Sequence, residues 1–310
     1  MNISSTESTE NEVYFKDLFI IAWKFKFSII LITAVAAIAS VYYAIHIPNT
    51  YKSEALMSIS DSSSSGSDLS RYSGLASIAG INIPQSSSED KLTLAIETIR
   101  SREIVERLIK DEIILINLMA AKSFNWSTNK LYIDPEIYST LKSEWLRTPS
   151  GPFVAKPSSL EAHRAYMKSL SIRREGNYFT LSIEHISPIF AKTLLEQVIK
   201  EVNTINREKD KSESYLALEY LKSEYTKTPL KGMQQSINAL IEGQLQKQMV
   251  ANIREEYLIS AIDKPFIPEF KSSPNRGVLC IMGTVFGFIF ALLISLLREF
   301  TIKNYLKGTS

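Results

Sequence analysis

Cysteine and histidine are both scarce in this sequence, and their scarcity removes several kinds of chemistry. One cysteine, Cys280, occurs among 310 residues, so no intramolecular disulfide can form and cysteine usage gives no information on the redox compartment. Cys280 lies in an uncharged apolar run, a setting that disfavours a thiolate, so we interpret it as a packing residue. The three histidines, His46, His163 and His185, do not stand at metal-ligand spacing, and no HExxH occurs. We therefore expect no metal site.

The sequence signatures of common enzymes are missing as well. No glycine is followed by lysine, which excludes a P-loop, and no G-x-S-x-G nucleophile elbow occurs. No two aspartates stand two positions apart, so the Asp-x-Asp pattern common in sugar-nucleotide transferases is absent. The adjacent carboxylates Asp111-Glu112 and Glu255-Glu256 would not share one face of a helix, which is typical of solvated charges. We expect no catalytic residue and no cofactor, and hence no enzyme.

Charge of one sign is not in excess. The formal net charge is +2, charged residues make up 22% of the chain, and no Lys/Arg stripe stands out against the acids. A nucleic-acid-binding domain usually carries such a stripe, so we expect no nucleic-acid partner. Apolar residues make up 45% of the chain and are concentrated near its two ends. Their concentration there predicts membrane-spanning segments.

The first apolar run covers residues 27–47, FSIILITAVAAIASVYYAIHI, and contains no Lys, Arg, Asp or Glu. At ~1.5 Å per residue, a helix of this length covers ~30 Å, the thickness of the hydrocarbon core. Trp23 and Phe25 before the run, and Tyr42 and Tyr43 near its end, suit the membrane interface. A secretory signal would have a shorter apolar core and a small-residue cleavage site after it. We therefore predict an uncleaved transmembrane helix.

A second uncharged apolar run occupies residues 277–297 and is also long enough to cross a membrane. Both tails outside the two runs are basic. Lys16, Lys24 and Lys26 precede the first run, and Arg298, Lys303 and Lys307 follow the second. By the positive-inside rule, both tails, residues 1–26 and 298–310, are expected in the cytoplasm. Residues 48–276 would then lie in the periplasm, as the main domain of a bacterial inner-membrane protein with two spans.

The segment between the two runs shows the patterns of both strands and helices. Alternation of apolar and polar residues predicts strands, a spacing of three to four residues predicts helices, and clustered Ser and Gly predict loops. The expected elements are a strand at 50–59, a Ser-rich loop at 60–88, helices beginning near Ser88 and Ser101, an irregular stretch at 122–160 with a short helix at 137–146, a hairpin at 169–184, and a strand at 258–262.

A single long helix is predicted over residues 188–228. Ser187 and Pro188 suit the N-cap and the first helical position, and no further glycine or proline occurs before Pro229. Such a helix is too long to be covered by its own domain, so it should project or pack against another subunit. After Pro229 a second helix leads back toward the last strand. The predicted fold class is α+β, a two-span membrane protein with a small mixed sheet and a long extended helix.

Seven segments, in order along the chain, carry a family likeness: DLFIIAWKFKFSIILI, NTYKSEALMSI, GLASIAGI, TIRSREIVERLI, KPSSLEAHRAYMKSLSI, YFTLSIEHISPIFAKTLLEQVIKEVN and AIDKPFIPEFKSSPNRGVLCIMGTVFGF. Together with the two-span topology, they resemble the Wzz family of polysaccharide co-polymerases, the O-antigen chain length determinant proteins. The last segment is the most specific, because members carry a Pro/Gly-rich stretch that overlaps the second span. Here that stretch contains Pro265, Pro268, Pro274, Gly277, Gly283 and Gly287. We expect these residues to contact the membrane or a partner.

The resemblance implies a function without catalysis. It implies a regulator of the modal length of the O-antigen of lipopolysaccharide, which assembles as a ring-shaped homo-oligomer and acts with a Wzy-type polymerase. The growing undecaprenyl-linked glycan and membrane lipid would be further partners. Some relatives carry a C-terminal tyrosine kinase with a P-loop. This chain has no P-loop and only Tyr305 after the second run, so it resembles the kinase-less branch.

Other functions remain open at this stage. The same role for capsule, exopolysaccharide or enterobacterial common antigen would give the same sequence pattern. A two-span periplasmic sensor is an alternative of another class, although the residues after the second run are expected to be too few for an output domain. A periplasmic glycan-modifying enzyme is the third alternative, and it would need the catalytic groups that are missing above.

Overall fold

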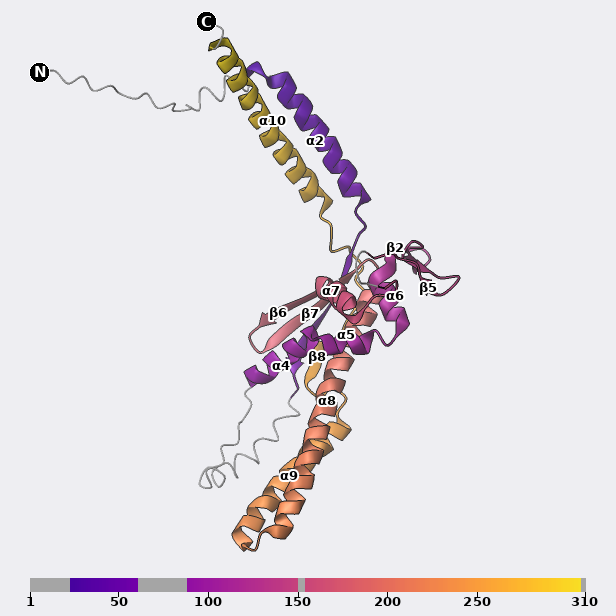
Figure 1. Cartoon of the computed structure of the whole chain (residues 1–310), viewed down its shortest axis with the longest axis vertical. Helices are drawn as coiled ribbons and strands as arrows, with labels where there is room; N and C mark the ends of the chain where they lie inside the picture. The colour runs from indigo at the N-terminus through magenta and orange to yellow at the C-terminus, as the bar shows by residue number, and fades with distance from the viewer. Residues whose placement is uncertain (1–22, 61–87, 150–153, 308–310) are drawn as a thin grey trace, which may run out of the picture. The chain divides into compact units, whose positions relative to one another are not determined.

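The computed structural model describes residues 23–60, 88–149 and 154–307, and it divides the chain into two compact units (Figure 1). One unit comprises residues 1–48 and 273–310, and the other comprises residues 49–272. The first unit holds two long helices, α2 (Lys26–His46) and α10 (Arg276–Lys307). The second holds a sheet, several helices and a helical hairpin. The GLASIAGI segment and most of the predicted Ser-rich loop lie outside the described residues.

The sheet of the second unit has four strands in the order β6-β7-β1-β8. Every neighbouring pair is antiparallel, so the α+β class is confirmed but the expectation of a mixed sheet is wrong. The β6–β7 hairpin could only be antiparallel, because its strands are joined by a tight turn at Gly176, where φ is +62°. The strands are β1 (Tyr51–Ile59), β6 (Leu170–Glu175), β7 (Tyr178–His185) and β8 (Ile259–Asp263).

Short helices pack around this sheet, and polar side chains fix where three of them begin. Ser101 and Asp111 accept hydrogen bonds from the first-turn backbones of α5 and α6, and Ser158 forms a capping box with Glu161 at the start of α7. Arg147 donates to both carboxylate oxygens of Glu161, at 2.7 and 2.8 Å, and holds the pKa of that carboxyl near 2. The helices are α4 (Ser88–Arg100), α5 (Arg102–Leu108), α6 (Glu112–Ala120) and α7 (Ser159–Ser169).

The predicted short helix at 137–146 is wrong. Tyr138 pairs with Trp145 across a small hairpin, and their rings meet edge to face with centroids 5.1 Å apart. Ser143 adopts φ +54°, which a continuous helix does not allow. The stretch from 121 to 145 therefore forms two hairpins, with strands β2 (Ala121–Asn125), β3 (Lys130–Ile133), β4 (Tyr138–Ser139) and β5 (Glu144–Trp145).

The long helix α8 (Pro188–Lys227) begins at the N-cap Ser187, whose hydroxyl accepts a hydrogen bond from the Phe190 N–H. Its first half is amphipathic and covers the sheet, where its buried side chains join those of β1 and β7 in one core. Its second half packs against α9 (Lys231–Ile253), which runs back alongside it (Figure 1). The long helix is therefore half in the core and half in a helical hairpin, and does not project alone.

Asn203 ties the helical hairpin back to the sheet. It is buried on α8, and its side-chain oxygen accepts hydrogen bonds from the backbone N–H groups of Leu258 and Ile259 at 2.8 and 2.9 Å. Its amide donates to the carbonyl oxygens of Ile259 and Ile199. One side chain therefore positions the chain as it leaves the hairpin and enters β8.

Candidate functional site

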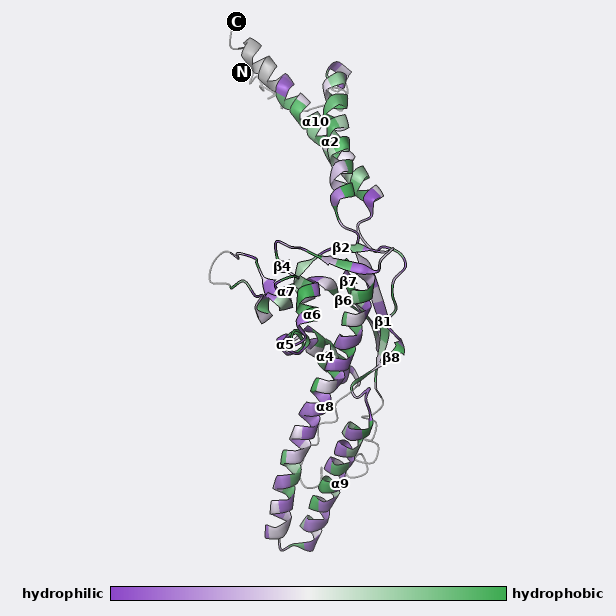
Figure 2. Ribbon diagram, turned by 90° about the vertical axis from the view of Figure 1, so that its right-hand side faces the viewer, coloured by the Kyte–Doolittle hydropathy of each residue, from purple (hydrophilic) through white to green (hydrophobic). Residues whose placement is uncertain are grey.

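The two helices of the first unit have the length and composition of membrane spans. Residues Lys26–His46 and Arg276–Glu299 are each apolar enough to cross a membrane, and little of either is buried. Figure 2 shows α2 and α10 mainly in the hydrophobic colours. Phe27, Ile38 and Phe286 are exposed by 79%, 71% and 63%. So large an apolar surface indicates a lipid or protein neighbour rather than water.

Gly283 and Gly287 lie where α10 meets α2. A Cβ atom built at Gly283 would stand 2.3 Å from the Cβ of Ser40, and one built at Gly287 would stand 2.3 Å from the Cβ of Ala36. Neither position has room for a methyl group unless the helices move apart. The absence of a side chain is therefore what allows the two backbones to approach closely.

The contact extends beyond the two glycines with the same spacing. Ala291, Ser295 and Glu299 follow at intervals of four residues and are buried at 0, 3 and 9% exposure. Residues four apart share a helix face, so they continue the stripe. At its end Lys24 Nζ lies 2.7 and 2.9 Å from the two carboxylate oxygens of Glu299. None of these three residues was among the predicted contact residues, although their recurrence every fourth position after Gly287 is a signal in the sequence.

The remaining predicted contact residues lie elsewhere. Pro265 and Pro268 follow β8 in the second unit, where Pro268 is buried, and Pro274 and Gly277 flank the start of α10. A Cβ at Gly277 would meet only the Asn275 side chain, at an ordinary 3.6 Å. Among the six predicted residues, only Gly283 and Gly287 are brought to a common helix contact. A partner-binding role for any of the six stays a prediction.

His185 is a structural residue in the second unit. Its Nδ1 accepts a hydrogen bond from the Ser187 N–H at 3.0 Å, so its Nε2 carries the proton and donates to the Asn117 carbonyl oxygen, also at 3.0 Å. Burial lowers the pKa of His185 to about 4. The ring is therefore neutral at pH 7, and both of its nitrogens are occupied.

This arrangement predicts an acid-sensitive fold. Because the folded pKa of His185 lies below its unfolded value of about 6.5, its contribution to stability is complete above pH 6.5 and is lost as the pH falls toward 4. Between pH 7 and pH 5 the loss should reach about 2 kcal/mol. Thermal unfolding of the full chain in detergent should show this loss. His185→Asn should be less stable at pH 7, but its melting temperature should fall less on acidification. An equal fall in the melting temperature of both proteins on acidification would contradict this role of His185.

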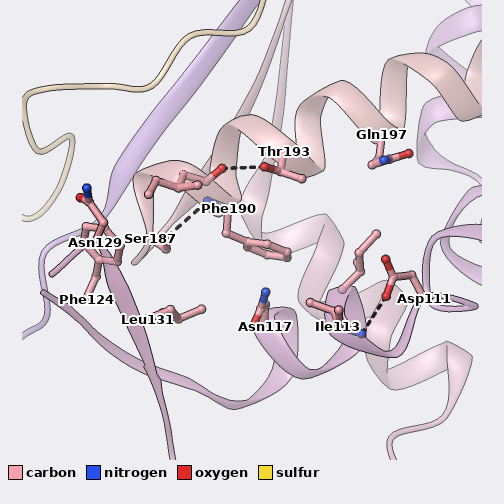
Figure 3. Close-up of a pocket in the computed structure, with 12 residues that line it drawn as sticks. Asp111, Ile113, Asn117, Phe124, Asn129, Leu131, Ser187, Phe190, Thr193 and Gln197 are labelled. Carbon is pink, nitrogen blue, oxygen red and sulfur yellow. Dashed lines mark hydrogen bonds between the residues drawn. The ribbon is translucent and has the colours of Figure 1, made fainter. Parts of the chain in front are cut away.

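A shallow cleft of about 240 Å³ lies beside the start of α8 (Figure 3). Its walls come from three segments: the residues of α6 and its N-cap, the β2–β3 hairpin, and the first turns of α8. Within the described residues no group of His, Cys, Asp and Glu is placed to hold a metal ion. This cleft was not predicted from the sequence, because two of its walls, α6 and the β2–β3 hairpin, were not among the expected elements.

The α8–α9 hairpin presents exposed apolar side chains on both of its helices. Tyr215, Leu216 and Tyr220 on α8 are 66, 62 and 66% exposed, and Met249 and Ile253 on α9 are 61 and 76% exposed. Asp210 and Lys247, 2.9 Å apart, join the two helices. Both helices of the hairpin therefore leave apolar side chains exposed and without a partner among the described residues.

Comparison with known proteins gives one family match. Residues 11–112 match the model of the family described as Wzz, chain length determinant protein. A solved structure described as a full-length bacterial polysaccharide co-polymerase aligns with 94% of this chain and 99% of its own, at 13% identity and a TM-score of 0.40. No curated protein sequence matches the chain. The similarity to the Wzz family of chain length determinant proteins therefore covers about the first third of this chain.

Proposed function

We propose that this protein sets the modal length of a surface polysaccharide by binding, and that it makes or breaks no glycan bond itself. The observation that carries the proposal is the match of residues 11–112 to the chain length determinant family. The sequence supports a role without catalysis, because the P-loop, metal and nucleophile signatures of the common enzyme classes do not occur in it. The glycan is the O-antigen of lipopolysaccharide, and the partner is a Wzy-type polymerase that extends undecaprenyl-linked units.

The protein acts as a homo-oligomer in this proposal. The exposed apolar face of the α8–α9 hairpin supports it, because aromatic and methionine side chains of this kind are enriched where proteins associate. A second copy of the same hairpin offers the matching surface, as closed symmetric assemblies require. The assembly gives the regulator a binding surface larger than one subunit can provide.

The protein spans the inner membrane twice in this proposal, with residues 48–276 in the periplasm. The basic flanks of both apolar runs support this topology. Leu141 is 98% exposed, so a cysteine at this position in a Cys280→Ser background should react with a membrane-impermeant thiol reagent on intact spheroplasts. A cysteine at Ser5 should react only after lysis. The reverse labelling pattern would contradict the proposed topology.

Deletion of the gene tests the function directly. Surface polysaccharide from the deletion strain should keep its repeat unit and linkages but lose its modal length, giving a broad and mostly shorter distribution on a gel. Restoring the gene should restore the mode. A strain that makes no polymer, or a polymer with altered linkages, would favour an enzyme. An unchanged distribution would favour a sensor, and loss of the mode in capsule or exopolysaccharide alone would move the role to that glycan.

A further inference from the structure

The cleft beside the start of α8 has the composition of a carbohydrate site. The half-buried ring of Phe124 lies in its wall together with aliphatic side chains, whereas the Phe190 ring is only 6% exposed and belongs to the core (Figure 3). Three side-chain amides, those of Asn117, Asn129 and Gln197, come from its three different walls. The weakly polar C–H groups on the face of a sugar ring suit an aromatic surface, and its hydroxyls suit amides that both donate and accept.

The amides of the cleft are available for a ligand. The side-chain amides of Asn117, Asn129 and Gln197 make no hydrogen bond to another residue that the structure describes. The hydroxyls of Ser187 and Thr193, by contrast, form hydrogen bonds with the backbone of α8. Amides that stabilise the fold would be paired with the backbone, as Asn203 is. Asn129 adopts φ +51° in the turn between β2 and β3, which by itself favours an asparagine, so Asn117 and Gln197 are the two amides that a polar, hydroxyl-rich ligand would use.

The charge of the lining and the volume of the cleft restrict the class of ligand further. The lining contains one carboxylate, Asp111, and no lysine, arginine or histidine. A phosphate or pyrophosphate would find no cationic side chain there and would meet the Asp111 carboxylate, so a neutral part of a glycan suits the lining better than its lipid-linked end. The cleft of about 240 Å³ is smaller than the roughly 300–1,000 Å³ typical of sites for drug-sized ligands. One neutral sugar ring fits these limits.

We propose that the cleft formed by α6, the β2–β3 hairpin and the start of α8 binds one neutral sugar ring of the polysaccharide. The inference rests on the proposed function for the source of the sugar. Asn117 and Gln197 hydrogen-bond its hydroxyls, and Phe124 contacts its apolar face. A contact of this kind lets the regulator hold the glycan itself, separately from any contact with the polymerase.

Calorimetric titration of the full-length protein in detergent tests the site. The probe is the surface polysaccharide of the producing cells, freed from lipid by mild acid hydrolysis. The variant N117A/Q197A removes two amides that no fold contact uses. The matched control N252A/Q246A makes the same two substitutions at exposed positions of α9. Loss of two hydrogen-bonding groups should weaken binding by tenfold or more in the cleft variant, and the control should bind as the unsubstituted protein does.

Three results overturn the site. The first is equal affinity of the cleft variant and its control, and the second is no saturable binding to the unsubstituted protein at millimolar sugar. The third is a cleft variant whose only change is loss of the oligomer, which would make the cleft a contact between copies. The proposed function is tested by a different measurement, the band pattern of the polysaccharide from the deletion strain. That pattern does not depend on whether the cleft binds a sugar.

Discussion

Asn203→Ala is expected to destabilise the second unit by about 3–5 kcal/mol, the largest effect of any single polar substitution proposed for this chain. The substitution leaves the N–H groups of Leu258 and Ile259 without their acceptor in a buried site, and each such loss costs about 1–3 kcal/mol. The carbonyl oxygen of Ile259 loses its amide donor as well. In a unit of this size, the melting temperature should fall by roughly 10 °C.

Asn206 supplies a matched control one turn further along α8. It is equally buried, at 5% exposure against 4% for Asn203, but its amide donates only to the Val202 carbonyl of its own helix. Asn206→Ala therefore removes a buried asparagine without leaving a strand unpaired, and it should cost about 1 kcal/mol or less. Thermal unfolding of the full chain in detergent compares the two variants. Equal losses would mean that Asn203 contributes by packing alone.

An aspartate at the same position separates hydrogen bonding from packing. Asn203→Asp keeps an acceptor for the two N–H groups but places a second oxygen where the amide now meets the carbonyls of Ile259 and Ile199. The buried carboxyl should therefore be bound more easily in its protonated form, with a folded pKa above about 3.9. Its stability relative to the unsubstituted protein should improve as the pH falls below the folded pKa. A constant difference across pH would contradict this account.

The local parts of the fold were predictable because their signals lie close together in the sequence. Ser187 and Pro188 fix the start of α8, and the position of Pro229 fixes where it must end. Gly176 in the turn and the alternating residues on either side fix the β6–β7 hairpin. In each case one residue type has a conformational property that few others share, and the pattern needs no knowledge of distant contacts.

The parts that were missed depend on partners far along the chain. Asn203 stands 55 residues from Leu258, and Lys24 stands 275 residues from Glu299, so neither pairing leaves a local signal. The short helix predicted at 137–146 failed for a local reason instead, because the packing of the nearby Tyr138 and Trp145 rings favours a hairpin. The prediction of a mixed sheet was wrong because strand direction depends on pairings such as that of β1 with β8, which lie at opposite ends of the domain in the sequence. The proposed carbohydrate cleft joins α6 and the β2–β3 hairpin, which follow one another in the sequence, to the start of α8, which lies far along the chain.

Gly287→Ala is expected to separate α2 from α10 and to weaken chain-length control. The new methyl would stand 2.3 Å from the Ala36 Cβ, whereas carbon atoms pack at about 3.5–4.0 Å. Since both atoms are attached directly to helix backbones, no side chain can rotate away, and the helices must move apart by about 1–2 Å. Nitroxide labels at the exposed positions Ile38 and Phe286, in a Cys280→Ser background, should report this increase in their mean distance.

The double variant A36G/G287A should restore the contact that G287A disrupts. The contact has room for one methyl group, and either helix can carry it. In A36G/G287A the methyl is transferred from α2 to α10, so the close approach should return and the label distance should match that of the unsubstituted protein. A36G alone should not separate the helices, although glycine in a helix interior costs about 1 kcal/mol. If the modal length of the polysaccharide is lost in G287A and regained in A36G/G287A, the close pairing of the spans is needed for function. A label distance restored without the mode would mean that the face of α10 around Gly287 meets the polymerase. Unchanged distance and mode in G287A would show that the two helices do not meet at this glycine in the membrane.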